Sequence, residues 1–214
     1  MNNLDFKHTV ILRYFSMTFL LYKKMTSNSF IKIELDETFD ADNAVLMPGS
    51  KDTNAINKDV SVKNVGSNDA WVRVIISVPS ALDVLTVKPE NYEEIAAQNI
   101  LHWNIVAGID EIWNVEKACW EAKLSADQAY NEYTFYYNKP LEAGDTTEQL
   151  LDQVYLDAKV DCDIAEDGSY VWTKGDQVIN YQLEKGASIL VKAEAIQADG
   201  FETYAEAFAA FDAQ

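Results

Sequence analysis

The chain has 214 residues, of which 48% are hydrophobic, enough to build a substantial core and to exclude a wholly disordered protein. Its 35 acidic and 17 basic side chains give a formal net charge of −18, which repels phosphate backbones and argues against nucleic acid as a partner. Residues 1–28 hold one acidic and four basic side chains, a charge of +3, so the remainder carries −18 − 3 = −21.

The basic head contains the most apolar stretch of the chain, residues 9–22 (TVILRYFSMTFLLY). A membrane-spanning helix needs roughly 20 apolar residues, so no stable membrane span is expected. The run loosely fits an export signal, but Lys23, Lys24 and Met25 follow it in place of a small-residue cleavage site. We interpret residues 1–27 as an N-terminal extension or degenerate signal segment, and residues 28–214 as one domain.

The acidic body is predicted to consist mostly of strands. Residues 30–35 alternate between apolar and polar side chains, and residues 47–49 (Met-Pro-Gly) indicate a turn. Apolar residues at 60–65 and 70–78 flank the polar turn sequence 66–69, which predicts a β-hairpin. Three later strands are predicted at residues 133–137, 154–160 and 189–196.

Helices are predicted to be few. One is expected within residues 89–101, and a second should begin at Thr146, whose spacing to Gln149 fits a capping box. The same spacing joins Thr203 to Glu206 near the C-terminus. One apolar face of a helix follows there, formed by Tyr204, Ala207, Phe208 and Phe211. Short strands with isolated helices predict a mainly β protein, an antiparallel β-sandwich.

Catalytic and metal-binding signatures are missing from the sequence. His8 and His102 are the two histidines, and His102 lies among apolar neighbours, so a packed or surface histidine is favoured over a catalytic one. Cys119 and Cys162 could form one disulfide, but two small, partly buried side chains are favoured. We therefore assign no catalytic, cofactor-binding or metal-binding residue, and no cofactor.

Two weaker signals have a structural and a functional interpretation. Residues 161–168 (DCDIAEDG) are acidic but do not fit a calcium-binding EF-hand loop, which favours a solvated acidic loop; Asp40, Asp42 and Asn43 form a similar weak cluster. Exposed tryptophans could stack on sugars, although core packing is favoured for each. The candidates are Trp103, Trp113, Trp120 and Trp172.

Several phrases occur in an order that resembles the TasA/camelysin family, exported fibre-forming proteins of the biofilm matrix of Gram-positive bacteria. They are residues 46–49 (LMPG), 62–74 (VKNVGSNDAWVRV), 136–141 (YYNKPL) with 144–147 (GDTT), and 191–201 (VKAEAIQADGF). In plain physical terms these phrases look like turn and core residues that define a fold.

The resemblance implies a jelly-roll-like β-sandwich, export through a dedicated signal peptidase, and an extracellular or cell-surface location. It further implies a non-enzymatic structural protein that self-associates, or that binds other matrix or cell-surface components. The physical route would be β-strand addition by an N-terminal strand at residues 28–35. Two alternatives stay open: a camelysin-like metalloprotease, and a jelly-roll module that binds glycans or surfaces. The head departs from the family pattern of a long apolar signal.

Overall fold

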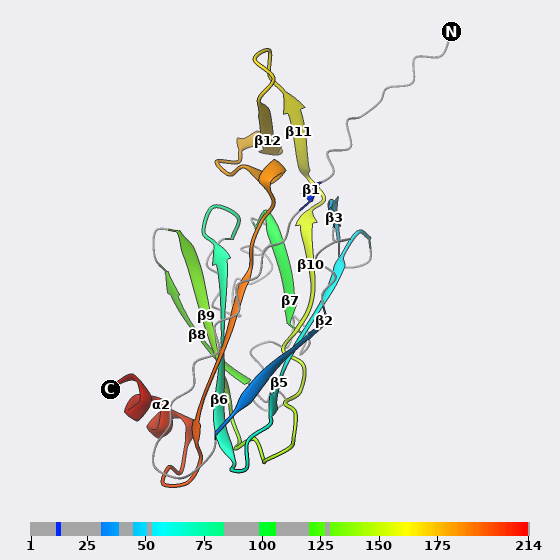
Figure 1. The fold of residues 1–214 in the computed structure, drawn as a ribbon. Helices are drawn as coiled ribbons and strands as arrows, with labels where there is room; N and C mark the ends of the chain where they lie inside the picture. Colours follow the sequence, from blue (N-terminus) through cyan, green and yellow to red (C-terminus); the bar gives the residue numbers. More distant parts are fainter. Residues whose placement is uncertain are drawn as a thin grey trace.

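The structure is a computed structural model (Figure 1). It describes residues 12–13, 31–38, 45–50, 53–83, 99–105, 120–126 and 129–213. The strands are β1 (Leu12–Arg13), β2 (Ile33–Thr38), β3 (Val45–Leu46), β4 (Pro48–Gly49), β5 (Ile56–Asn64), β6 (Ala70–Pro79), β7 (Leu101–Ile105), β8 (Trp120–Ala126), β9 (Tyr130–Tyr137), β10 (Leu151–Asp157), β11 (Val160–Ile164), β12 (Tyr170–Lys174), β13 (Gln177–Val178) and β14 (Leu190–Gln197). The helices are the short 3-10 helix η2 (Leu183–Lys185) and α2 (Tyr204–Asp212).

Two mainly antiparallel sheets enclose the main core. One has the order β14-β6-β9-β8, and the other has the order β2-β5-β10-β4 with β7 also paired to β10. Fully buried side chains from both sheets meet between them, among them Val60 and Val62 of β5 and Val72, Val74 and Ile76 of β6. This arrangement confirms the prediction of a mainly β, jelly-roll-like antiparallel sandwich with a short C-terminal helix.

The strand β6 is buried on both faces. Its even-numbered side chains point into the core, whereas Trp71 on the other face lies in a second apolar cluster with Tyr136 and Phe208. The helix α2 covers that outer face, as Figure 1 shows. The predicted C-terminal helix is therefore confirmed, and Thr203 caps it by accepting a hydrogen bond from the backbone N–H of Glu206 at 3.3 Å.

The predicted hairpin at residues 60–78 is wrong. The strands β5 and β6 have the expected sequence ranges, but they belong to different sheets, and the turn between them is a corner of the sandwich. Fully buried Asn64 anchors this corner: its side-chain amide donates to the carbonyls of Asn68 and Leu141, at 2.8 and 3.0 Å. Its carbonyl oxygen accepts from the Gly66 N–H at 3.0 Å. Both edges of β6 are already paired, with β14 and β9.

The helix predicted to begin at Thr146 is also wrong. The chain runs beside β5 there: the N–H of Thr147 donates to the carbonyl of Val62 at 2.9 Å, and the Thr147 hydroxyl accepts from the Val62 N–H at 3.0 Å. Pairing with a buried strand satisfies these groups, so the local capping pattern is overridden by tertiary contacts. The strand predicted at residues 154–160 is divided between β10 and β11 by a turn at residues 158–159.

Other predictions are confirmed with shifted boundaries. The strands predicted at residues 30–35, 133–137 and 189–196 correspond to β2, β9 and β14. The turn predicted at residues 47–49 lies slightly later, because Pro48 and Gly49 form β4 and the reversal joins Ser50 to Thr53. Most of the predicted helix at residues 89–101 lies outside the described residues, and Leu101 begins β7.

Little of the predicted N-terminal segment, residues 1–27, falls within the described residues. Leu12 and Arg13 form β1, which pairs antiparallel with Val45 and Leu46 of β3. The division into an N-terminal segment and a single domain from residue 28 stays a prediction. In the described ranges, no helix has both the length and the apolar character needed to cross a membrane.

Candidate functional site

His102 belongs to a buried polar cluster at one end of β7. Its Nε2 lies 3.0 Å from Asp157 Oδ2, the same oxygen lies 2.9 Å from Lys174 Nζ, and the imidazole stacks on Tyr155 with 4.8 Å between ring centroids. Burial lowers the pKa of His102 below its ordinary value of 6.5 and outweighs the opposing effect of Asp157. Hydrogen bonds from the Lys159 backbone, Lys174 and His102 lower the pKa of Asp157, although burial opposes them. The cluster ties β7 to β10 and β12, so His102 is packed between strands and does not lie free on the surface.

Trp103 and Trp172 are core residues. Trp103 packs edge-on against Tyr133, with 4.6 Å between ring centroids, and its indole N–H donates to Asp83 at 3.3 Å. Trp172 is 4% exposed, and its N–H donates to Glu184 at 3.0 Å. Core packing is thus confirmed for these two candidates, and neither can present a ring to a sugar. Trp113 and the side chain of Trp120 lie outside the described residues.

Asp83 is a buried carboxyl surrounded by donors. It accepts hydrogen bonds from the Tyr133 hydroxyl and the Trp103 indole, and from the Asn131 amide at 2.8 Å. Burial raises the pKa of Asp83 above its ordinary value of 3.8 against the effect of these donors. All three partners come from strands that line the core, so the cluster holds the segment after β6 against β7 and β9.

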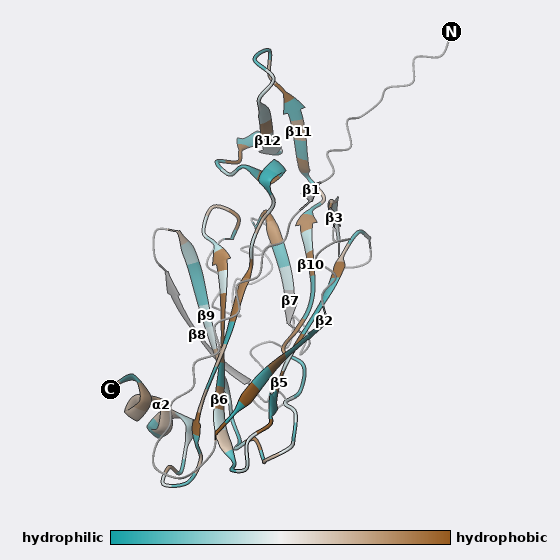
Figure 2. Cartoon of the chain, in the orientation of Figure 1, coloured by the Kyte–Doolittle hydropathy of each residue, from teal (hydrophilic) through white to brown (hydrophobic). Residues whose placement is uncertain are grey.

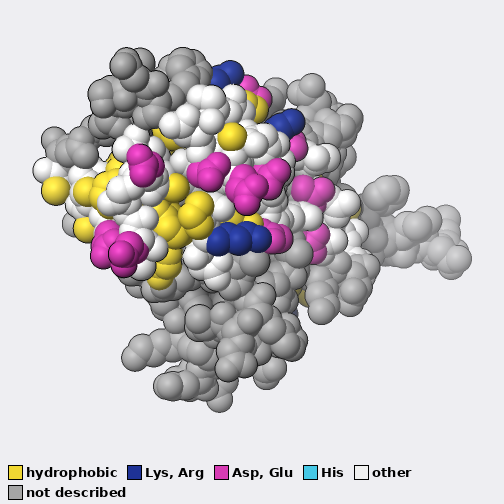
Figure 3. All heavy atoms as spheres, turned by 90° about the horizontal axis from the view of Figure 1, so that it is seen from below, with side chains coloured by type: hydrophobic (Ala, Val, Ile, Leu, Met, Phe, Trp, Pro, Cys, Tyr) yellow, Lys and Arg dark blue, Asp and Glu magenta, His cyan; other side chains and the backbone are white. Residues whose placement is uncertain are grey.

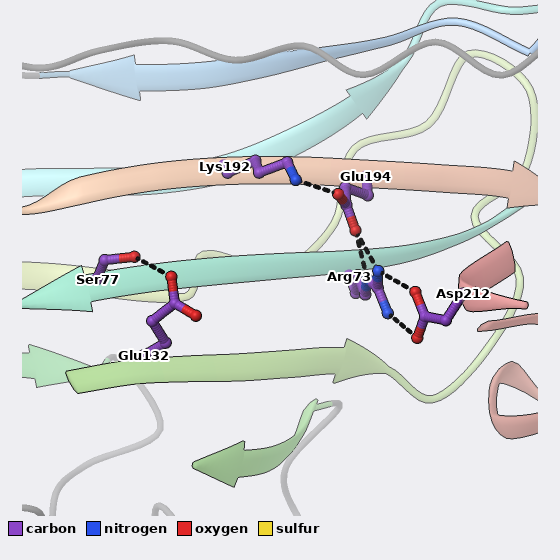
Figure 4. A network of polar contacts seen from close by, with 6 residues as sticks. All are labelled: Arg73, Ser77, Glu132, Lys192, Glu194 and Asp212. Atoms are coloured by element: carbon purple, nitrogen blue, oxygen red, sulfur yellow. Dashed lines mark hydrogen bonds and ion pairs between the residues drawn. The ribbon is translucent and has the colours of Figure 1, made fainter. Parts of the chain in front are cut away.

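A third buried cluster fastens the helix α2 to the sheet (Figure 4). Arg73 of β6 donates from Nε to Glu194 of β14 at 2.5 Å, and from its two terminal nitrogens to Asp212 at 2.8 and 2.6 Å. The guanidinium lies over the rings of Phe208 and Phe211, 4.6 and 5.2 Å from their centroids. Although burial opposes it, these two carboxylates raise the pKa of Arg73 above its ordinary value.

The acidic sequence at residues 161–168 forms the end of β11 and the turn that follows it. Asp161, Asp163, Glu166 and Asp167 are exposed, and Asp167 accepts hydrogen bonds from the N–H and hydroxyl of Ser169, at 2.9 and 2.6 Å. The predicted solvation is confirmed, but residues 161–164 belong to a strand and not to a loop, because they pair with β12. Within the described part of the chain, no three His, Cys, Asp or Glu side chains are grouped so that they could hold a metal ion. The weak cluster of Asp40, Asp42 and Asn43 lies outside the described residues.

Cys162 is a free, half-buried thiol. Its predicted alternative partner, Cys119, lies outside the described residues.

The N-terminal strand of the body, β2, lies at the edge of its sheet. It pairs antiparallel with β5 over six residue pairs, from Ile33 opposite Asn64 to Thr38 opposite Asp59. It occupies the end of the sheet order, so β5 is its one hydrogen-bonded neighbour among the strands that the structure describes. Figure 1 shows β2 crossing beside β14, the edge strand of the opposite sheet, with which it is in contact. β2 therefore closes one open side of the sandwich.

The inner face of β2 is fastened by a buried ion pair. Ile33 is 6% exposed, and Glu37 lies on the same face four residues later, where it accepts a hydrogen bond from Lys58 of β5. The side chains of Lys58 and Glu37 are 0% and 5% exposed. Among the residues that the structure describes, the second carboxylate oxygen of Glu37 has no hydrogen-bond partner. Burial lowers the pKa of Lys58, with Glu37 opposing it. This pair holds the edge strand in one register with β5.

The buried charges of the Arg73 and Lys58 clusters were not predicted from the sequence, although the positions of Arg73 and Glu194 in the sequence indicate burial. Arg73 interrupts the apolar run of β6 and Glu194 that of β14, and the two residues are cross-strand partners. Opposite charges at facing positions of two apolar strands indicate a buried pair once the strands are known to be neighbours. Glu37 and Lys58 had no such signal, because both lie in polar surroundings in the sequence.

These features define an antiparallel β-sandwich with structural polar clusters. No protein-family model matches the sequence, and no curated protein matches it. Among solved structures, the chain is similar to a carbohydrate-binding module, CBM3b, from the cellulosomal cellobiohydrolase 9A of Clostridium thermocellum. The two share 10% sequence identity with a TM-score of 0.31, and the match covers 77% of this chain and 94% of that one. A likeness at this level has no bearing on what the chain binds.

Proposed function

We propose that this chain is a non-enzymatic structural protein of a bacterial cell surface or extracellular matrix, and that it assembles by exchanging its N-terminal strand between copies. The resemblance of four ordered phrases to the TasA/camelysin family supports the location and the role. The proposed mode of assembly rests on the position of β2. This strand is the first of the body, lies at a sheet edge and covers core side chains.

The edge of β5 that β2 covers would accept the β2 strand of a second copy. Val60 and Val62 of β5 are fully buried, and Lys58 beside them is paired with a carboxylate from β2. A chain that withdrew its own β2 would expose this apolar edge and separate the buried Lys58 ammonium from the Glu37 carboxylate, at a large cost. The β2 strand of a second copy supplies the same side chains in the same register, so the exchange keeps every contact.

In a one-way exchange, each copy donates its β2 to the next copy and receives the β2 of the previous copy on its own β5. Such a head-to-tail contact does not close on itself, and it therefore grows into a filament. The body carries −21, and acidic side chains are prominent on the lower face of the molecule in Figure 3. Mutual repulsion of copies at low salt is screened at higher ionic strength, so assembly should respond to salt, cations and acid.

Paired cysteines test the exchange in the full chain. Asp36 and Ser61 lie opposite each other in the register of β2 and β5, within the range that a disulfide can bridge. One protein carries Asp36→Cys and another Ser61→Cys, each with Cys119 and Cys162 replaced by serine. The two are mixed under assembly conditions (acid pH, added calcium or raised salt) and then oxidised mildly. We expect the mixed disulfide dimer to accumulate together with light scattering.

A matched control uses Asp36→Cys mixed with Ser169→Cys, an exposed position in the turn between β11 and β12. Random collision would link that pair as readily as the first. The proposal fails if assembly proceeds without the mixed Asp36→Cys and Ser61→Cys dimer, or if the protein stays monomeric under all these conditions. Chelator-sensitive proteolysis by a homogeneous preparation would instead identify an enzyme.

A further inference from the structure

The sheet of β11, β12 and β13 projects from the body of the sandwich and carries an unusual concentration of exposed apolar side chains. Figure 1 shows it extending beyond the ends of the two main sheets. In the described part of the chain, the exposed large hydrophobic side chains are Ile164, Tyr170 and Val178, at 50%, 44% and 65% exposure. All three belong to this small sheet, although single exposed apolar residues are normally scattered over a protein surface.

Two of these side chains form one continuous surface. Ile164 and Tyr170 are direct cross-strand partners, so they lie side by side on the same face. The next pair on that face, Cys162 and Trp172, is half-buried and buried respectively, and it joins the main core. Val178 pairs with Thr173 and so lies on the opposite face. The apolar face thus runs outward from the core and ends uncovered at Ile164 and Tyr170.

The surroundings of this apolar pair are negative. The exposed carboxylates of Glu166 and Asp167 lie in the turn just beyond the pair, while the exposed Asp161 and Asp163 alternate with Cys162 and Ile164 and so lie on the opposite face of β11. The sequence has neither lysine nor arginine between residues 160 and 173. Figure 2 shows β11 in mainly hydrophilic colours, with a hydrophobic position near its tip. The negative field extends to the apolar face, since Asp163, Glu184 and Asp161 add to burial in raising the pKa of the Cys162 thiol.

We propose that the Ile164 and Tyr170 face of this hairpin is a docking surface for a cationic polypeptide segment that also carries an aliphatic or aromatic anchor. Such a segment would place its apolar side chain on the exposed pair and its lysines or arginines beside the Glu166 and Asp167 carboxylates of the turn. The negative charge disfavours nucleic acid, anionic lipid surfaces and sulfated glycans. It equally disfavours the acidic body of a second copy.

Binding to short peptides tests the surface in the full chain. The probe KLKYKLK combines cationic and apolar side chains, KGKGKGK has the same charge without the anchors, and ELEYELE reverses the charge. We expect KLKYKLK to bind at least about tenfold more tightly than either of the others by fluorescence anisotropy. We also expect its binding to weaken between 50 and 200 mM salt, because the exposed charges are screened.

Two variants locate the site. The double change Ile164→Ser with Tyr170→Ser should weaken KLKYKLK binding at least about tenfold, because it removes the apolar pair while the charges stay. The matched control, Val178→Ser, removes an exposed apolar side chain from the opposite face of the same sheet and should leave binding unchanged. Because all three side chains are exposed, both variants should keep the circular dichroism spectrum and unfolding midpoint of the parent.

Three results would each overturn the proposal. Equal binding of KGKGKGK and KLKYKLK would mean that the carboxylates act without the apolar pair. Equal loss in Val178→Ser would mean that this face is not the site. Loss of self-association in the double variant, without any loss of peptide binding, would assign the surface to a second copy.

Discussion

The Arg73 cluster gives a stringent test of how α2 is held, through the substitution Arg73→Met. Methionine keeps most of the side-chain volume but removes the charge, and it leaves the buried carboxylate of Glu194 with Lys192 as its remaining cationic partner. Losing one partner of a buried pair costs about 3–5 kcal/mol. Since Lys192 remains, we expect a loss of about 3 kcal/mol in the free energy of unfolding, near the lower end of that range.

The other side of the cluster should matter much less. Asp212 is 55% exposed, whereas Glu194 is 4% exposed, so Asp212→Asn should cost less than about 1 kcal/mol, as exposed ion pairs do. The double variant Arg73→Met with Glu194→Met replaces both buried charges with apolar groups. It should be about 2 kcal/mol more stable than Arg73→Met alone, because no buried carboxylate loses its main partner.

Urea unfolding of the full chain, followed by tryptophan fluorescence, measures these differences. With a slope of about 2 kcal/mol per molar urea, Arg73→Met should lower the midpoint by about 1.5 M. A midpoint within about 0.3 M of the parent would refute the account of Arg73 as a buried anchor. So would a double variant that is no more stable than Arg73→Met.

Three further predictions concern pH dependence, a buried corner and a helix cap. Burial lowers the pKa of His102, so between that lowered pKa and 6.5 the folded chain binds fewer protons than the unfolded chain. The free energy of unfolding should therefore fall as the pH is lowered through this window. In urea unfolding at pH 5, 6 and 7, His102→Asn should make the midpoint depend less on pH than it does in the parent. Asn64→Ala removes three hydrogen bonds to backbone groups at the corner and should cost about 2–4 kcal/mol. Asn64→Asp keeps an acceptor for Gly66 but turns a buried carboxylate toward the carbonyls of Asn68 and Leu141, so it should destabilise at least as much. Equal midpoints for Asn64→Ala and the parent would contradict this role. Thr203→Ala should cost about 1 kcal/mol by loss of the cap of α2, and Thr203→Ser should restore most of it.

The sequence predicted the fold class well because the signals for it are local. Alternation of apolar and polar residues identified β2, and predominantly apolar runs identified β6 and β14, because the burial of one or both faces of a strand determines its residue types. The error at residues 60–78 has a different origin. A polar turn between two apolar strands looks the same whether the strands pair or separate into two sheets, and the difference depends on distant strands. At this corner, for example, Asn64 and Ala70 bond to Leu141, far along the chain.

The candidate surfaces were less predictable than the strands. The N-terminal strand was identified from its alternation, but its place at a sheet edge depends on the pairing of β5 with β10, which no local pattern encodes. The exposed pair at the tip of the hairpin follows from the register of β11 and β12. In the sequence, Ile164 and Tyr170 look like ordinary strand residues, and their exposure becomes visible only when the hairpin is seen to extend past the core.

The separation of β5 and β6 into different sheets has a consequence for how the chain is made. The partner of β6 on one side is β14, near the C-terminus, so its sheet cannot close until residues 190–197 have been synthesised. Pairing of such distant segments is slow, because a long loop must close before any contact forms. A nascent chain therefore keeps this sheet open until the β14 segment has been synthesised.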